Sequence, residues 1–237
     1  MPLMKTANTD TNRWTIPRQL VILLSPLILG ILEIWHPVGL PNKSAFESIL
    51  PQVDWWLTLH LLQVPLFGLV ALAVFLMVNN LRGWAARISR IGMAFFVVFY
   101  TALDAITGIA GGTLISSARN LPPNVQFFVS KQVNLLFFDP LIGGSTLSLV
   151  GILGAGGWFV GVTAAAIALA QIGVDRLSVL LLILAAILFA LSHTPPTGPL
   201  GLLFFFLAVT RIDPRVWSGK NNTEVDFSGE EGRSQYG

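Results

Sequence analysis

Ionisable side chains of types that bind metals or move protons occur within the apolar part of this chain. Glu33 and His36 lie at the end of the first apolar run, in ILEIWHPVGLP, residues 31–41. Their spacing of three residues puts both side chains on one face of a helix. His60 and Asp104 lie in later apolar runs, and His193 ends another. Because a charge in hydrocarbon is costly unless it is paired or bound, these residues are candidates for a functional site.

Imidazole and carboxylate groups together form a suitable ligand set for zinc or another divalent first-row ion. We therefore predict a metal site made by His36, His60, Asp104 and His193. Three such ligands and a water would make a catalytic centre, in which Glu33 or Asp104 is the base that takes a proton from the water. Gln63, one helical turn from His60, falls on the same face.

These residues must be positioned by helices that cross a membrane. The chain is 54% hydrophobic and only 11% charged, with a mean hydropathy of +0.72, whereas a soluble domain carries about a quarter charged residues. A membrane helix needs about 20 apolar residues. Six apolar runs are of roughly this length: 19–36, 55–79, 91–115, 142–172, 177–193 and 199–212.

We therefore predict an all-α integral membrane protein, a bundle of six transmembrane helices. Residues 1–18 form a polar N-terminal segment, residues 19–212 the membrane domain and residues 213–237 a polar cytoplasmic tail. The basic residues follow the positive-inside rule, which makes both termini cytoplasmic in a plasma or inner membrane. They cluster in three segments on one side of this topology: Lys5, Arg13 and Arg18; Arg82, Arg87 and Arg90; and Arg211, Arg215 and Lys220.

The same topology places all three histidines in the outer half of the membrane. His36 and His193 end their helices at the outer face. His60 lies roughly 8 Å below that face, and Asp104 lies about 20 Å from the inner end of its helix. The sequence thus predicts one polar site in the outer-leaflet half of the bundle.

Composition also excludes several classes of protein. The chain has no cysteine, so disulfides, thiolate metal sites and cysteine nucleophiles are excluded. Its net charge of +2 reflects the basic membrane flanks, and no basic face exists for a nucleic acid. The expected partners are the lipid bilayer and a lipid or hydrophobic small molecule. A homo-oligomer or a larger membrane complex is also compatible with the sequence.

The longest connection, residues 116–140, lies on the outer side of the predicted topology. Within it, residues 124–138 mix aromatic and polar side chains after a proline pair, a pattern typical of an interfacial amphipathic helix. This segment is either a surface anchor or a lid over the site. Glycines in 107–112 and 143–161 predict close helix packing.

Several functions fit these features. The first is a metal-dependent hydrolase of a lipid or another membrane-soluble substrate. The second is a non-enzymatic membrane subunit, such as a transporter or an assembly or accessory protein. In that case Glu33 pairs with His36 or His60, and Asp104 bonds to Tyr100 or Thr107. A haem-binding protein is a lesser alternative.

The predicted ligand set is similar to that of the intramembrane hydrolases of the ceramidase and adiponectin-receptor type. Those proteins have seven spans and a paired-histidine motif on a late helix, whereas six spans and a single His193 are expected here. Ser145 with His193 is loosely similar to the catalytic pair of the six-span rhomboid proteases, but Thr146 stands where a glycine should follow the serine. Neither resemblance assigns the chain to a family.

Overall fold

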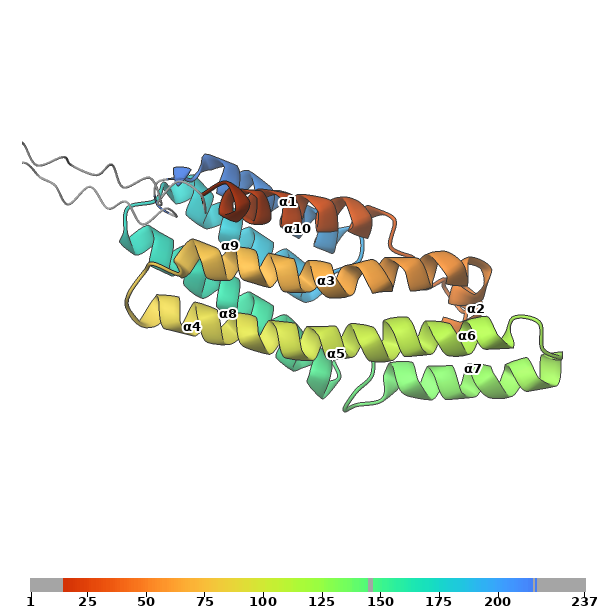
Figure 1. Ribbon diagram of the computed structural model, residues 1–237. Coiled ribbons are helices and arrows are strands. Elements are labelled where there is room, and N and C mark those ends of the chain that lie inside the picture. The colour runs from red at the N-terminus through yellow and green to blue at the C-terminus, as the bar shows by residue number, and fades with distance from the viewer. Residues whose placement is uncertain (1–14, 145–146, 215, 217–237) are drawn as a thin grey trace, which may run out of the picture.

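The computed structural model describes residues 15–144, 147–214 and 216, and in this part of the chain all regular structure is helical. Figure 1 shows the helices as a bundle. In chain order they are α1 (Thr15–Ile34), α2 (Ala45–Ile49), α3 (Val53–Val78), α4 (Trp84–Phe95), α5 (Thr101–Leu103), α6 (Gly111–Ala118), α7 (Pro123–Phe138), α8 (Leu149–Gln171), α9 (Arg176–Leu191) and α10 (Thr197–Arg211). A short 3₁₀ turn, η2 (Leu50–Gln52), joins α2 to α3, and two π-helical segments, η3 (Phe96–Tyr100) and η4 (Asp104–Ala110), join α4 to α6.

Among the described residues, four helical segments are long and apolar enough to cross a membrane: Ile16–Ile34, Ala45–Val78, Trp84–Ala118 and Leu149–Gln171. Helices α9 and α10 are apolar but have only 16 and 15 residues. At a rise of 1.5 Å per residue they are roughly 24 and 22 Å long, less than the hydrocarbon thickness of about 30 Å. The fold is therefore that of a helical protein suited to a membrane, with four full-length segments where the sequence predicted six spans.

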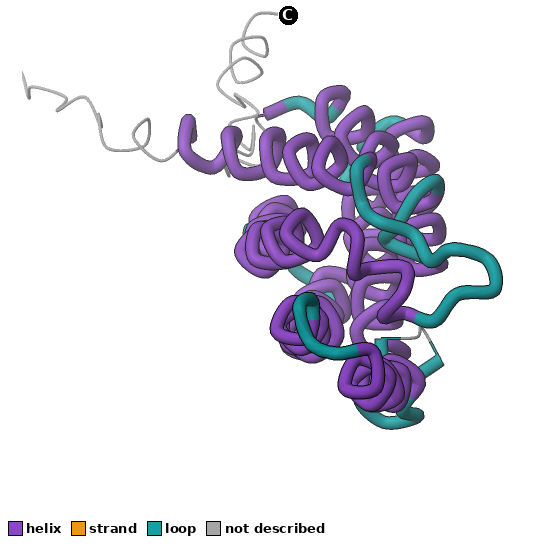
Figure 2. Tube along the Cα trace, turned by 90° about the vertical axis from the view of Figure 1, so that its right-hand side faces the viewer, coloured by secondary structure: helices purple, strands orange, loops and turns teal. Residues whose placement is uncertain are grey.

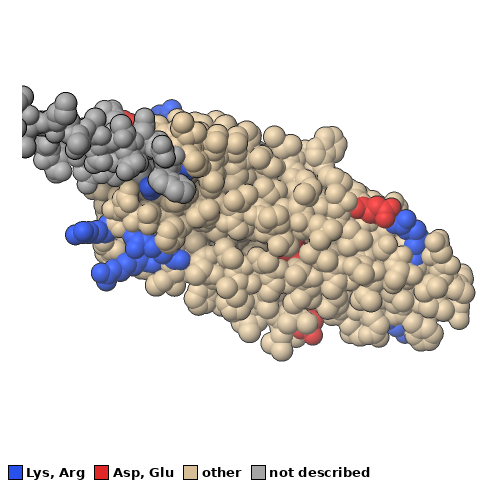
Figure 3. All heavy atoms as spheres, in the orientation of Figure 1, with Lys and Arg blue, Asp and Glu red and all other residues tan. Residues whose placement is uncertain are grey.

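Charged side chains are segregated along the bundle. In Figure 1, the α3–α4 turn, the α8–α9 connection, the start of α1 and the end of α10 lie at the same end. Figure 3 shows Lys and Arg gathered at that end, beside a broad band with almost no charged atoms on the visible face. Arg90 belongs to this end and donates to the carbonyl oxygens of Val78 and Leu81 at the end of α3.

Helix α7 occupies the range in which the sequence predicted an amphipathic segment. It begins at Pro123, and proline is favoured at the first position of a helix because its missing N–H is not needed there. Figures 1 and 2 show α6 and α7 side by side and antiparallel, joined by a short loop. Together with α2 they form the end of the bundle opposite the basic end.

The helix of the fourth apolar run begins later than predicted. It was expected at residue 142, whereas α8 begins at Leu149. The Asp139 carboxylate accepts the backbone N–H groups of Leu141 and Ile142, which folds this segment into a turn. The helix begins only after Ser148, whose hydroxyl accepts the N–H of Gly151.

Aromatic side chains fill the core near the middle of the bundle, where α3, α8 and α9 meet η3. Trp158, Phe67, Phe96 and Phe189 are all fully buried, and the ring centroids of Trp158 and Phe189 are 4.7 Å apart. Glycines bring α4 and α8 into contact, because a Cβ on Gly92 would lie 2.7 Å from the Cα of Gly161. The predicted role of the glycines of the fourth apolar run in close packing is confirmed at Gly161.

Asp175 caps the N-terminus of α9, and its removal should destabilise the protein. One carboxylate oxygen accepts the Ser178 N–H at 3.1 Å and the other accepts the Ser178 hydroxyl at 2.5 Å. These hydrogen bonds from Ser178, first the hydroxyl and then the N–H, lower the pKa of Asp175 below its usual value of 3.8. We expect Asp175→Ala to cost about 1 kcal/mol of stability at neutral pH.

The lowered pKa of Asp175 also fixes the pH dependence of this effect. Its stabilising contribution is present above the unfolded-state pKa and is lost as the pH falls through the folded-state pKa. The measurement is the thermal midpoint of wild type and Asp175→Ala in detergent at pH 7 and near pH 3. The difference between the two proteins should shrink in acid, and an equal difference at both pH values would contradict the prediction.

Candidate metal centre

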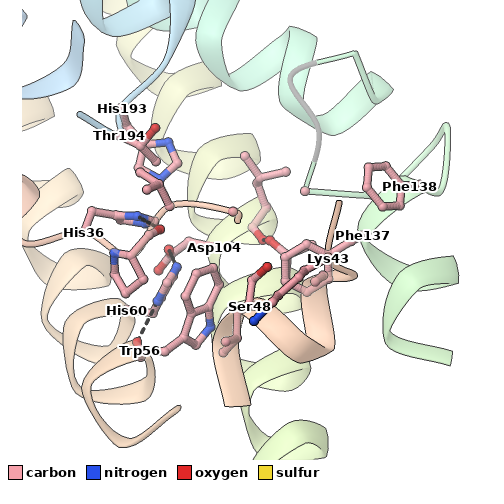
Figure 4. Close-up of a pocket in the computed structure, with 18 of the residues that line it drawn as sticks. His36, Lys43, Ser48, Trp56, His60, Asp104, Phe137, Phe138, His193 and Thr194 are labelled. Carbon is pink, nitrogen blue, oxygen red and sulfur yellow. Dashed lines mark hydrogen bonds and ion pairs between the residues drawn. The ribbon is translucent and has the colours of Figure 1, made fainter. Parts of the chain in front are cut away.

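The candidate site lies where several helices begin or end. Glu33 is in the last turn of α1, and His36 follows that helix. His60 comes from α3, Asp104 begins η4, and His193 lies just beyond α9. Figure 4 shows the three histidines and Asp104 gathered at one side of a single cavity. The structure therefore brings residues together that are up to 160 positions apart in the chain.

The cavity has a volume of about 310 Å³, at the lower end of the range for small-molecule sites. Imidazole and carboxylate groups form one wall, and aromatic and aliphatic side chains form much of the rest. Its lining includes His36, Val38, Lys43, Ser48, Ile49, Trp56, His60, Tyr100, Leu103, Asp104, Thr107, Phe137, Phe138, His193 and Thr194.

Glu33, His36 and His193 form a group that could hold a metal ion. Each offers one ligand atom, and these atoms lie within 4.8 Å of one another. Zinc–ligand bonds near 2.1 Å place neighbouring ligand atoms of a tetrahedral site about 3.4 Å apart. Glu33 is fully buried and His36 is 7% exposed. Small side-chain movements would bring the three ligand atoms to the distances that an ion requires.

Backbone hydrogen bonds fix the protonation of two of the histidine rings. The Nδ1 atom of His36 lies 2.8 Å from the carbonyl oxygen of Pro37, and that of His60 lies 2.7 Å from the carbonyl oxygen of Trp56. Because a carbonyl oxygen can only accept, each Nδ1 must carry a proton. The Nε2 atoms then hold the lone pairs that bind metals in neutral imidazole.

Several buried acceptors in this cluster have no hydrogen-bond donor. The Oε2 atom of Glu33, the Oδ2 atom of Asp104, the Nε2 atom of His36 and the Oε1 atom of Gln63 have no hydrogen-bond partner among the described residues. An unpaired buried polar atom costs about 1–3 kcal/mol. The cluster therefore lacks hydrogen-bond donors or positive charge. A bound cation would supply the positive charge.

His60 and Asp104 form a second, smaller pair. The Nε2 atom of His60 lies 3.7 Å from the Oδ1 atom of Asp104, and both side chains are nearly inaccessible to solvent. Since the His60 proton is on Nδ1, a neutral His60 and an ionised Asp104 would present two acceptors to each other. Protonation of either group would remove this repulsion.

This arrangement differs from the predicted one. The sequence predicted His36, His60, Asp104 and His193 as ligands and Glu33 or Asp104 as the base. In the structure Glu33 groups with His36 and His193, while His60 and Asp104 face each other. The reason lies at the end of α1, where the His36 N–H donates to the Glu33 carbonyl oxygen in a final turn. That turn keeps both side chains within one group with His193.

The hydrogen bonds of the metal-free alternative are not those seen in the structure. Glu33 accepts from Gln63, at 2.5 Å between Nε2 and Oε1, rather than from a histidine. The Thr107 hydroxyl donates to the Leu103 carbonyl oxygen at 2.8 Å. Within the described residues Asp104 therefore has no hydrogen bond from Thr107. Ser145, the serine of the rhomboid comparison, lies outside the described residues.

Trp56 and Gly108 shape the site and were not identified from the sequence. The Trp56 indole N–H donates to the Gly108 carbonyl oxygen at 2.7 Å, and its ring centroid lies 4.2 Å from that of His60. Gly108 belongs to the π-helical segment η4, and such segments often occur at functional sites. The glycines of 107–112 were interpreted as helix-packing residues, although Gly108 makes room for His60.

Comparisons with protein-family models, with curated proteins and with solved structures found no match to this chain. The chemistry of the site must therefore be inferred from its own residues. Three features point the same way: the grouped ligand atoms, the fixed imidazole protons and the buried acceptors without donors. All three are expected of a centre that holds a divalent cation.

Proposed function

We propose that this protein is a metal-dependent hydrolase of a lipid or another membrane-soluble substrate, with its site in the outer half of a plasma or inner membrane. Glu33, His36 and His193 hold the ion, and zinc suits these ligands best. The observation that carries the proposal is the group of buried acceptors without donors. A cation would satisfy the free atoms of Glu33 and His36 at the same time.

The donor set also fits catalysis better than a purely structural metal site. Three protein ligands leave a coordination position for water or substrate, as in catalytic zinc centres. A bound ion of this kind lowers the pKa of water and polarises a carbonyl or phosphoryl group. The cavity, which is lined by two of the three ligands, His36 and His193, has room for such a substrate group.

Within this proposal Asp104 is the general base. Its Oδ2 atom is buried without a partner, and its Oδ1 atom faces the Nε2 atom of His60. Oδ2 is therefore free to take a proton from water in the cavity. Gln63 is a positioning residue because its amide holds one oxygen of Glu33 and leaves the other for the ion.

The proposal includes the six-span topology, with both termini cytoplasmic. The basic end seen in Figure 3 supports this orientation through the positive-inside rule. Helices α9 and α10 would complete the six spans, although each is short. The candidate site then lies toward the outer leaflet, since His36 and His193 follow the ends of α1 and α9 farthest from the basic end.

Metal analysis of the purified protein tests the proposal together with one variant. We expect about one divalent ion per chain in wild type and lipid hydrolysis that a chelator abolishes. Asp104→Asn should retain the ion and fold but lose activity by roughly 10²-fold or more, because it removes the base. Wild-type protein that binds no metal when zinc is supplied would overturn the proposal.

The second candidate is a non-enzymatic membrane subunit or transporter with a structural polar cluster. The enclosed His60–Asp104 pair favours it, since one shared proton would satisfy both atoms without an ion. Haem binding is not favoured by the geometry. The His36 ring contacts those of His60 and His193 edge-on, with centroids 5.3 and 4.9 Å apart, whereas a bis-histidine haem lies between its imidazoles.

A further inference from the structure

We infer that the cavity binds the head of an anionic amphiphile, with Lys43 as the residue that recognises its carboxylate or phosphate. This inference deepens the proposed function, because it names the chemical class of the substrate for the same site. The inference depends on Lys43 and the apolar residues near it and not on the metal ligands.

Large apolar side chains are exposed in two segments that contribute to the cavity. Val38 and Leu40 are 51% and 43% exposed, and Phe138 and Leu141 are 71% and 61% exposed. Val38 and Phe138 themselves line the cavity. Apolar groups exposed beside a cavity in this way are typical of a contact with lipid or with an apolar ligand. A ligand would therefore reach the site from the lipid phase.

Lys43 is the only basic side chain that lines the cavity within the described residues. Figure 4 shows it beside Ser48, on the opposite side of the cavity from His193. The described residues give Lys43 no ion pair. Its nearest acidic neighbour in sequence, Glu47, accepts the N–H and hydroxyl of Ser44 at 2.8 and 2.9 Å. Glu47 interacts with Lys43 through its charge but forms no ion pair with it, so the Lys43 ammonium can still bind an anion.

The placement of these groups defines the ligand. A cation beside apolar side chains attracts an anion more strongly than the same cation in water. The cavity wall also includes Trp56 and Phe137, which suit an apolar stem. A volume of about 310 Å³ holds a polar head and the first part of a chain. The rest of the alkyl chain of the ligand would lie against the exposed apolar side chains beside the cavity and in the bilayer.

Binding of decyl phosphate to the purified, metal-stripped full-length protein tests this inference. We expect decyl phosphate to bind at least about tenfold more tightly than decanol, because a charge-assisted hydrogen bond is lost with the uncharged alcohol. Lys43→Gln should reduce the affinity for decyl phosphate to that for decanol. Inorganic phosphate should not displace decyl phosphate at equal concentration, because it lacks the chain.

Lys131→Gln is the matched control. Lys131 lies on α7, where its ammonium is 4.6 Å from the centroid of the Phe127 ring, and it does not line the cavity. This variant should bind decyl phosphate as wild type does. Unchanged binding by Lys43→Gln would overturn the inference, as would equally strong displacement by inorganic phosphate. Because metal is absent from the assay, the inference can hold if the metal proposal fails, and the reverse is also true.

Discussion

Replacing His193 by alanine should reduce the affinity of the protein for zinc by at least about 100-fold, since even outer-shell changes at metal sites cost 10- to 100-fold. His193 contributes one of three ligand atoms that lie within 4.8 Å of one another. The remaining two ligands, Glu33 and His36, would bind an exchangeable ion only weakly. Zinc content after dialysis against a weak chelator measures the effect, and lipid hydrolysis should be lost in parallel.

Two controls separate metal binding from folding in this experiment. Thr194→Val changes the neighbouring residue, which lines the cavity but belongs to no metal-binding group, and should keep its zinc. The thermal midpoints of the metal-free proteins should be similar for wild type and His193→Ala. Retention of zinc by His193→Ala would refute its role as a ligand. A large fall in the metal-free midpoint would assign the residue to the structural alternative.

Adding a side chain at Gly108, in η4, should lower activity because it displaces His60 on the neighbouring helix α3. A Cβ there would lie 2.0 Å from Cδ2 and 2.5 Å from Cγ of His60. The His60 ring would have to turn, which would break its hydrogen bond to the Trp56 carbonyl oxygen and move its Nε2 atom away from Asp104. We expect Gly108→Ala to lower activity roughly 100-fold, as displacements near 1 Å do, and stability by about 1–3 kcal/mol through overpacking.

Gly108→Ala should change stability in the opposite direction from a glycine-to-alanine substitution at an open helical position. Glycine to alanine within an open helical position should stabilise by up to about 1 kcal/mol. Gly156 on α8 is such a position, because nothing lies within 4 Å of a Cβ built there. Gly156→Ala should therefore be neutral or stabilising, whereas Gly108→Ala should be destabilising. Thermal midpoints and hydrolysis rates of both variants provide the measurement, and matching behaviour of the two would contradict the role of Gly108.

The helices were largely predictable because their apolar runs are long and their charges lie between them. The start of α8 was not, since the apolar residues Leu141 and Ile142 are drawn into a turn by the Asp139 carboxylate. Hydropathy counts such residues as part of a span, although their backbone hydrogen bonds are made elsewhere. The short lengths of α9 and α10 were close to those of the predicted runs.

The candidate site was predictable in its residues and less so in its pairings. The spacing of Glu33 and His36 indicated a shared face, and the structure places both in one group with His193. The contact between Gln63 and Glu33 joins residues 30 positions apart on different helices. It depends on how α1 and α3 cross, which no periodicity along one helix determines. The space that Gly108 leaves for the His60 ring has the same origin.

The short lengths of α9 and α10 have a consequence for the surrounding lipid. Two neighbouring helices of roughly 24 and 22 Å cannot match a hydrocarbon layer of about 30 Å, and tilting would only shorten their reach. In the proposed six-span topology the bilayer beside them would thin, and each ångström of such hydrophobic mismatch carries a modest energetic cost. The protein should therefore be more stable in bilayers of short-chain lipids than in thick ones. In a cell with membranes of unequal thickness, the same mismatch would direct it to the thinner membrane.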